Sequence, residues 1–218
     1  MKRFLQENGL SVAMFVLFAI SLAGQIGTGL AESNEDREEH GQAPQDLGTY
    51  LVSGHFIEAV FENWESEFLQ MGAFVILTIG LRQKGSSESK KLEGEEEVDR
   101  EPTPKPGAPW PVMHGGLVAK VYENSLALAL FGLFALSFAL HAIGGSMEFN
   151  DEQAMHGAAE RVTALSYLAT PRFWFESFQN WQSEFMSVGA LIVLSIFLRQ
   201  RGSPESKPVD APHAETEG

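Results

Sequence analysis

Four apolar stretches separated by strongly polar segments dominate the chain. Residues 10–30, 68–81 and 185–198 hold no charged side chain, and residues 124–147 hold only His141 as a titratable group. An apolar helix of about 20 residues is long enough to cross the hydrocarbon core of a bilayer. No period-two alternation of the kind typical of membrane barrels occurs. The pattern therefore predicts four membrane-spanning helices.

The chain also contains two copies of one sequence pattern. Residues 63–90 and 180–207 are identical at 17 of 28 positions, and residues 7–29 and 123–145 are identical at 11 of 23. Apolar composition alone would not place matched polar residues in register. The comparison indicates a duplicated two-helix unit.

Together these patterns predict an all-α integral membrane protein made of two parallel-repeat helical hairpins. The expected spans are about 8–30, 63–82, 123–145 and 180–199. The expected parts of the chain are a first repeat (1–85), a flexible acidic and proline-rich linker (86–115), a second repeat (116–202) and a disordered tail (203–218). The linker carries half of the ten prolines, a composition that cannot bury enough apolar surface to order itself.

The distribution of lysine and arginine predicts the orientation in the membrane. The N-terminus, the linker and the C-terminal tail are rich in basic residues, whereas the other two connectors hold only Arg37, Arg161 and Arg172. Basic residues favour the cytoplasmic side. Both termini and the linker are thus expected in the cytoplasm. The basic start, apolar run and small residues of the N-terminus also fit a signal peptide, but the recurrence of the same segment inside the chain favours a retained helix.

Composition narrows the function classes. The formal net charge is −14, which argues against nucleic acid as a partner because phosphate binding needs basic patches. The chain has no cysteine, and its six histidines form no HxxH or HExxH spacing. No phosphate-binding or nucleophile motif occurs in a useful context. We expect no metal, no cofactor and no identifiable catalytic residues.

The second helix of each repeat has recognisable ends. Thr170 and Pro171 form an N-cap and a first-turn proline, and the equivalent helix is expected to begin near Ser53. Gly85 and Gly202 suit the left-handed position that ends a helix. The aromatic residues early in these helices are typical of a membrane-interface belt. The interface anchors expected on this basis are Trp64, Trp181, Arg82 and Arg199.

A polar cluster is expected in the outer leaflet of the membrane. Counting about 20 residues back from the cytoplasmic ends of the second helices places polar side chains below the outer surface. The first helices contribute polar groups at similar depth. The members of this candidate intramembrane cluster are Asn63, Ser66, Glu67, Asn180, Ser183, Glu184, Gln25 and His141.

Two interpretations of this cluster remain open. Its side chains can join helices by hydrogen bonds and complement helix ends, which is a structural role. Alternatively, Glu67, Glu184 and His141 can form a proton- or cation-responsive site, since ionisable groups at membrane depth are costly and usually functional. An intramembrane enzyme would need a nucleophile–base pair, and none is identifiable.

The doubled motif Asn-Trp-x-Ser-Glu-Phe followed by Leu-Arg-Gln-Lys/Arg-Gly-Ser-x-Glu-Ser-Lys resembles an uncharacterised family of bacterial membrane proteins, a domain of unknown function. The resemblance covers the chain except the linker and tail. It implies a protein of the bacterial cytoplasmic membrane and assigns no activity.

From the sequence we expect a structural or interaction module of that membrane. Its partners would be the lipid bilayer and either further copies of itself or another membrane protein. The alternative is a small proton- or cation-coupled transporter or channel that uses the paired outer-leaflet carboxylates.

Overall fold

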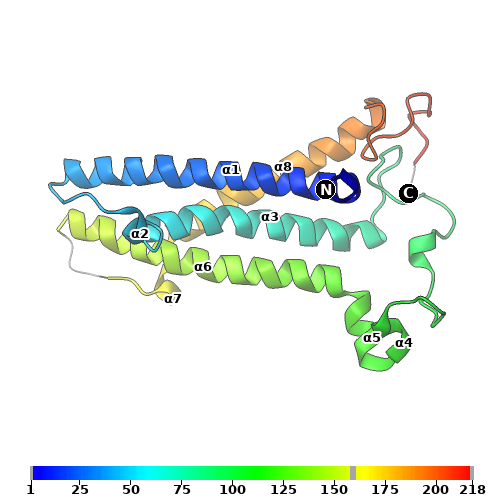
Figure 1. The fold of residues 1–218 in the computed structure, drawn as a ribbon, viewed down its shortest axis with the longest axis horizontal. Helices are drawn as coiled ribbons and strands as arrows, with labels where there is room; N and C mark the ends of the chain where they lie inside the picture. The colour runs from blue at the N-terminus through cyan, green and yellow to red at the C-terminus, as the bar shows by residue number, and fades with distance from the viewer. Residues whose placement is uncertain (1, 158–160, 217–218) are drawn as a thin grey trace. The chain divides into compact units, whose positions relative to one another are not determined.

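Four long helices make up most of the protein. The computed structural model describes residues 2–157 and 161–216. The chain is 69% helical, and its described part contains no strand, so the all-α prediction is confirmed. The long helices are α1 (Lys2–Glu39), α3 (Gly54–Gly80), α6 (Ser125–Met155) and α8 (Pro171–Phe197) (Figure 1).

Short helical elements connect the long ones. These are α2 (Leu47–Tyr50), η1 (Glu97–Asp99), α4 (Trp110–His114), α5 (Gly116–Glu123) and α7 (Ala164–Tyr167). The segment predicted as a linker thus contains η1 and α4, with irregular backbone between them. Its flexibility stays a prediction.

Two of the long helices are long and apolar enough to cross a membrane. These are α1, over Arg3–Glu39, and α6, over Ser125–Met155. The apolar window of α1 has none of its residues buried, and that of α6 has 22% buried. Helices α3 and α8 carry polar side chains in their first halves, and their crossing of a membrane stays a prediction.

The predicted starts of the second helices are confirmed. Helix α8 begins at Pro171, and the Phe173 amide donates to Thr170 Oγ1 at 3.3 Å. Helix α3 begins at Gly54, and the Phe56 amide donates to Ser53 Oγ at the same distance of 3.3 Å. Each hydroxyl satisfies one of the amides that a helix start leaves without a partner in the helix.

The ends of these helices lie earlier than the glycines suggested. Gly85 and Gly202 both have φ of +86°, the left-handed conformation expected of them. However, α3 ends at Gly80 and α8 at Phe197, so each glycine lies in a turn five residues beyond its helix. Each helix ends two residues before the arginine of its motif, Arg82 or Arg199, for reasons described below.

The chain divides into two compact units whose boundaries cut through three of the long helices. Unit 1 comprises residues 1–61 and 139–173, and unit 2 comprises residues 62–138 and 174–218. The buried apolar core of unit 1 is aromatic, with Tyr50, Tyr167 and Phe173 at its centre.

Unit 2 contains an aromatic cluster contributed by α6 and α8. Trp181 lies 6.3 Å from Phe134 and 5.5 Å from Phe178 between ring centroids, and Trp174 lies 6.3 Å from Phe138. These rings form edge-to-face and tilted pairs, the arrangements that aromatic quadrupoles favour. The residues expected as an interface belt therefore also pack against one another.

Candidate functional site

In unit 1, an asparagine near the end of each of α1 and α6 holds the chain that follows it. The Asn34 side chain donates to the Gln45 carbonyl at 3.1 Å and accepts from the Gln45 amide at 2.7 Å. Asn150 makes the same two bonds to Val162, both at 2.8 Å. We call each arrangement a clamped turn. Each clamp satisfies both backbone groups of one residue with a single side-chain amide.

Each clamped turn leads into a four-residue helix with its own N-cap. Asp46 accepts from the Thr49 amide at 2.8 Å at the start of α2. Thr163 accepts from the Ser166 amide at 3.2 Å at the start of α7. These caps direct the chain so that a tyrosine at the end of each short helix turns inward.

Tyr50 and Tyr167 are fully buried, and each lies against a glycine of a long helix. A Cβ atom at Gly29 would lie 2.1 Å from Tyr50 Oη, and one at Gly145 would lie 2.4 Å from Tyr167 Cε1. Glycine is required at both positions because any side chain would overlap the ring. In the structure Gly29 accommodates the Tyr50 ring.

The two tyrosines differ in what their hydroxyls contact. Tyr50 Oη lies 3.3 Å from His55 Nδ1, whereas Tyr167 Oη donates to Glu58 Oε1 at 3.1 Å. Burial, followed by the carboxylates of Glu32 and Glu148, raises the pKa of the Tyr50 phenol. The local field at the Tyr50 hydroxyl is therefore negative.

Glu58 and His141 form the most buried ionisable pair of unit 1. Glu58 is 7% exposed and His141 is 0% exposed, and their ligand atoms lie within 4.8 Å of each other. The His141 ring also stacks on Phe173 with centroids 4.7 Å apart. A carboxylate, an imidazole and the Tyr167 phenol are thus gathered in an apolar surrounding, where the charged form of each group is costly.

Glycines bring the backbones of α3 and α6 close together around this pair. A Cβ atom at Gly54 would lie 2.2 Å from the Glu148 amide nitrogen, and one at Gly144 would lie 2.5 Å from the Glu58 amide nitrogen. Small residues allow helices to approach closely, as in membrane helix pairs. This approach carries Glu58 into the interior.

Of the predicted cluster, only His141 and Gln25 belong to unit 1. His141 is in the buried pair just described, and Gln25 is half-buried on α1, one turn before Gly29. Sequence reasoning missed Glu58, which lies in the aromatic stretch taken as an interface belt. The sequence did indicate this position, because Glu58 is a carboxylate among apolar residues on a predicted helix.

The remaining predicted residues lie in unit 2 on α3 and α8. Ser66 Oγ donates to the Asn63 carbonyl at 2.7 Å, and Ser183 Oγ donates to the Asn180 carbonyl at 2.8 Å. These hydroxyls are thus bonded to their own helices, a common role for serine in helix interiors. Asn63 is exposed and Asn180 is half-buried. The side-chain amide of Asn180 donates to the backbone carbonyl of Glu176, one turn earlier on α8.

The two carboxylates of the predicted cluster interact electrostatically with each other. Glu67 is exposed and Glu184 is half-buried, and the charge of Glu184 acts on Glu67. The functional interpretation of this pair stays a prediction.

Glu65, at the variable position of the first Asn-Trp-x-Ser-Glu-Phe motif, was also missed. It is 0% exposed, and its carboxylate accepts from Trp181 Nε1 at 3.1 Å. Trp181 therefore has an internal hydrogen bond in addition to its ring contacts. Trp64, its counterpart, lies edge-on to Phe68 with centroids 6.5 Å apart.

The repeated Arg-Gln-x-Gly-Ser-x-Glu-Ser-Lys segments of unit 2 fold around their arginines. Arg82 Nη1 donates to the carbonyls of Thr78, Ile79 and Leu81 at 3.4, 3.1 and 3.0 Å. Its Nε donates onward to the Lys91 carbonyl at 3.3 Å. The arginine thus binds the last carbonyls of α3, which explains why the helix ends before Gly85. We call this arrangement the arginine cap.

Arg199 makes the same arginine cap at the end of α8. Its Nη1 donates to the carbonyls of Ser195, Ile196 and Leu198 at 3.1, 3.2 and 2.8 Å, and its Nε donates to the Pro208 carbonyl at 3.2 Å. The motif that recurs most faithfully in the sequence is therefore a helix-ending device.

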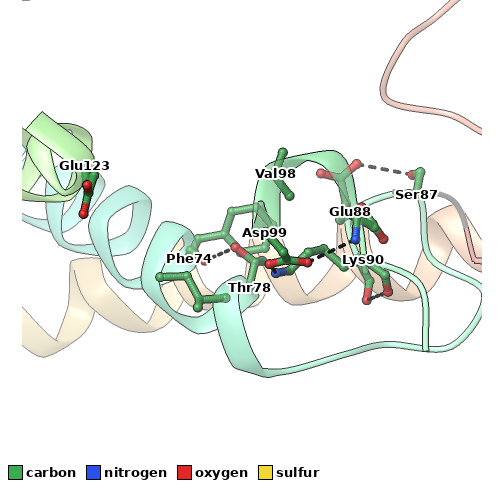
Figure 2. A pocket seen from close by; sticks show the side chains of 11 residues that line it. Phe74, Thr78, Ser87, Glu88, Lys90, Val98, Asp99 and Glu123 are labelled. Carbon is green, nitrogen blue, oxygen red and sulfur yellow. Dashed lines mark hydrogen bonds and ion pairs between the residues drawn. The ribbon is translucent and has the colours of Figure 1, made fainter. Parts of the chain in front are cut away.

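A cavity of about 700 Å³ lies beside the first arginine cap, within unit 2. Figure 2 shows Lys90 and Asp99 pointing toward each other there, and they form an ion pair. Burial, followed by repulsion from Glu205, raises the pKa of the Glu88 carboxyl, which also lines the cavity. The cavity is lined by residues of both charges.

The whole sequence, residues 1–218, matches the family described as a domain of unknown function (DUF6766). The chain belongs to this family. No curated protein and no solved structure matches it. Membership in DUF6766 agrees with the resemblance to an uncharacterised family and assigns no activity. The site must therefore be interpreted from its own chemistry.

Proposed function

We propose that this DUF6766 protein is an integral protein of the bacterial cytoplasmic membrane, in which two duplicated two-helix hairpins form a structural and interaction module. The observation that carries the proposal is α1. It is 38 residues long, and its apolar window has no residue buried by the rest of the chain.

The exposed apolar surface of α1 needs a covering. Leu10, Phe15 and Ile20 are 80%, 72% and 64% exposed. Burying one such side chain is worth about 1.5–3 kcal/mol, so a helix with many of them would not remain in water. Lipid and partner helices are the coverings that suit its length.

The matched contacts of the two repeats support the duplicated architecture. The clamped turns and the arginine caps each occur twice, at positions 116 or 117 residues apart. His40 and His156, at the ends of α1 and α6, lie 5.7 Å apart between ring centroids. Equivalent helices therefore end on the same side of unit 1, which supports parallel repeats with both termini in the cytoplasm.

Small residues of α1 supply an interaction face. A Cβ atom at Gly24 or Gly27 would meet nothing within 4 Å, in contrast to Gly29. Open glycines one turn apart let a second helix approach closely. We assign this face to a second copy of the chain.

The experiment is a self-association assay in lipid bilayers with fluorescently labelled protein. We expect energy transfer between wild-type copies and a loss of at least tenfold in association for Gly27→Leu. Gly9→Leu is the matched control, because Gly9 is also an open glycine on α1. A wild-type monomer at all protein-to-lipid ratios would refute the interaction module.

Topology can be tested independently. Reporter fusions after residue 45 and within residues 86–109 should report the outer and the cytoplasmic side, respectively. A cytoplasmic reporter that is active after residue 45 and silent in the linker would overturn the orientation.

A second candidate function, proton- or cation-coupled transport, is supported by one observation. Glu58 and His141 are ionisable groups buried inside unit 1, next to the Tyr167 phenol. Ionisable residues inside membrane bundles usually mark ion or proton pathways. This pair suits the role better than Glu67, which is exposed.

Flux measurements in proteoliposomes separate the two carboxylate sets. If transport uses the buried pair, the wild type should show proton or cation flux. Glu58→Gln should lower this flux at least tenfold. The double variant Glu67→Gln, Glu184→Gln should keep the wild-type flux. The reverse pattern would favour the outer-leaflet carboxylates, and absence of flux in the wild type would remove the transport candidate.

A further inference from the structure

A continuous groove runs along α3 and α8 within unit 2. One part of it is a cavity of about 160 Å³, lined mainly by apolar side chains of both helices, among them Phe74, Leu77, Phe185 and Ile192. A second cavity of about 250 Å³ shares Phe74, Leu77 and Ile192 with the first and continues past the end of α3. The two cavities therefore form one groove, which we call the α3–α8 groove.

Gly189 keeps the apolar part of the groove open. It lines the first cavity, and a Cβ atom at this position would meet nothing within 4 Å. Leu77 and Phe185 of the same lining are 49% and 44% exposed, although both are large apolar side chains. Burying such surface is favourable only against another apolar surface. The occupant of this part of the groove must therefore be hydrophobic.

The groove ends at two side chains of opposite charge. Arg82, the residue of the first arginine cap, and Glu88 both line the second cavity. The Nη2 of Arg82 has no hydrogen-bond partner within residues 2–157 and 161–216, in contrast to its Nη1 and Nε. Burial, followed by repulsion from Glu205, raises the pKa of the Glu88 carboxyl, so a cation beside it would stabilise its ionised form. This end of the groove thus suits an anion at Arg82 and a cation at Glu88.

The cavity of about 700 Å³ described above adjoins the charged end of the groove. The two share Phe74, Thr78, Glu88 and Ser89. Figure 2 shows the Phe74 and Thr78 side chains on one side of this cavity and those of Glu88 and Lys90 on the other. Lys90 is paired with Asp99, while Glu96 and Glu123 add two further carboxylates to the lining. The cavity therefore gives a headgroup room beside Glu88 and disfavours one with a net negative charge.

The length of the groove matches one leaflet of a bilayer. Its lining extends from Gln70 to Leu81 on α3, which is about 16 Å at 1.5 Å per residue. Half of the hydrocarbon core of a bilayer is about 15 Å thick. An acyl chain in the apolar part would thus place its headgroup beside Arg82 and Glu88.

We propose that the α3–α8 groove binds one phospholipid of the cytoplasmic leaflet whose headgroup carries a phosphate and a primary ammonium, as in phosphatidylethanolamine. The phosphate would accept from Arg82, and the ammonium would donate to Glu88 in a charge-assisted hydrogen bond. A quaternary ammonium has no N–H group to donate, and an anionic headgroup has no cation to pair with Glu88. The inference rests on the proposed membrane location and goes beyond it by naming a lipid class.

The test is native mass spectrometry of the full-length protein in detergent, titrated with phosphatidylethanolamine, phosphatidylcholine or phosphatidylglycerol of identical acyl chains. We expect one phosphatidylethanolamine per chain, bound at least fivefold more tightly than the other two lipids. Gly189→Leu should weaken this binding at least fivefold, because the new side chain would fill the groove. Gly132→Leu is the matched control and should bind as the wild type does, since Gly132 is also an open glycine of a long helix and does not line the groove.

A second variant tests the headgroup. Glu88→Gln should bring the affinities for phosphatidylethanolamine and phosphatidylcholine to within twofold of each other, while the variant keeps its helical circular dichroism. Glycerophosphoethanolamine, which has the headgroup without acyl chains, should not displace the bound lipid. Equal wild-type affinity for the three lipids, or unchanged binding in Gly189→Leu, would overturn the proposal.

Reconstitution into vesicles separates this outcome from the membrane location on which it rests. Protein that alkaline carbonate washes from the vesicles would contradict the membrane location, and the lipid site with it. Protein that stays in the vesicles but shows no lipid preference in the titration would overturn the lipid site alone.

Discussion

The clamped turns of unit 1 and the arginine caps of unit 2 are both repeated structures, yet they use their polar groups differently. In the arginine caps the guanidinium donors of Arg82 and Arg199 bind backbone carbonyls. Beside the clamped turns, His40 and His156 each engage only one ring nitrogen with the backbone. The segment that is more similar between the repeats thus ends helices through arginine side chains, whereas the less similar segment holds the following chain through asparagine side chains.

The comparison depends first on the close approach of the α3 and α6 backbones in unit 1. Gly144→Ala should destabilise the protein by about 3 kcal/mol, because its Cβ would overlap backbone atoms that cannot rotate away. Thermal unfolding in detergent measures the change. Gly132→Ala on the same helix is the control, because a Cβ there meets nothing within 4 Å. Equal stability of the two variants would show that the close approach does not stabilise unit 1.

Breaking one clamp tests whether the clamped turns stabilise unit 1. Asn150→Ala removes two half-buried hydrogen bonds and should cost about 1–2 kcal/mol. Thermal unfolding of the variant in detergent measures the effect. A variant as stable as the wild type would show that the clamp does not stabilise unit 1.

Breaking one arginine cap should lower stability by a smaller amount. Arg199→Ala should cost about 1 kcal/mol, since its carbonyl bonds are partly exposed to water. Arg199→Lys should restore little, because a lysine ammonium lacks the planar fork of donors. Thermal unfolding in detergent measures both variants. A loss of stability larger than that of Asn150→Ala would contradict the weaker role of the arginine cap.

The smallest expected effect concerns Glu88, next to the first arginine cap. Its raised pKa means that the folded chain binds this proton more tightly than the unfolded chain. Ionised Glu88 therefore destabilises the protein above its folded pKa, and the penalty disappears as the pH falls below the unfolded value.

Glu88→Gln should accordingly stabilise the protein at pH 7 by less than about 0.5 kcal/mol, because solvent screens this partly exposed group. The gain should vanish near pH 4. Thermal unfolding at both pH values measures it, with the exposed Glu93→Gln as control. A gain that persists at acid pH would mean that ionisation is not its cause.

Much of the local structure could be predicted from short-range signals. Ser53, Thr170 and Pro171 identify the starts of α3 and α8 because capping is chemistry between neighbours. The helix ends were misplaced by several residues. Gly85 and Gly202 have the expected left-handed backbone, but side-chain donors of Arg82 and Arg199 end the helices first.

The candidate sites were harder to predict because they are made by distant residues. Glu58 is separated from His141 by 83 positions, and its burial follows from the close approach at Gly144. The pairing of His40 with His156 requires α1 and α6 to end together. Counting membrane depth along single helices identified His141 but cannot show which side chains from different helices meet.

Each clamp joins two points of the chain, and the number of residues between these points can differ. The first clamp joins residues 11 positions apart and the second joins residues 12 positions apart, although their bonds are alike. This one-residue difference explains why the offset between repeats changes from 116 to 117. Residues 41–44, in the loop that Asn34 closes, are thus a suitable place for inserting an epitope or a small domain without rebuilding the helices.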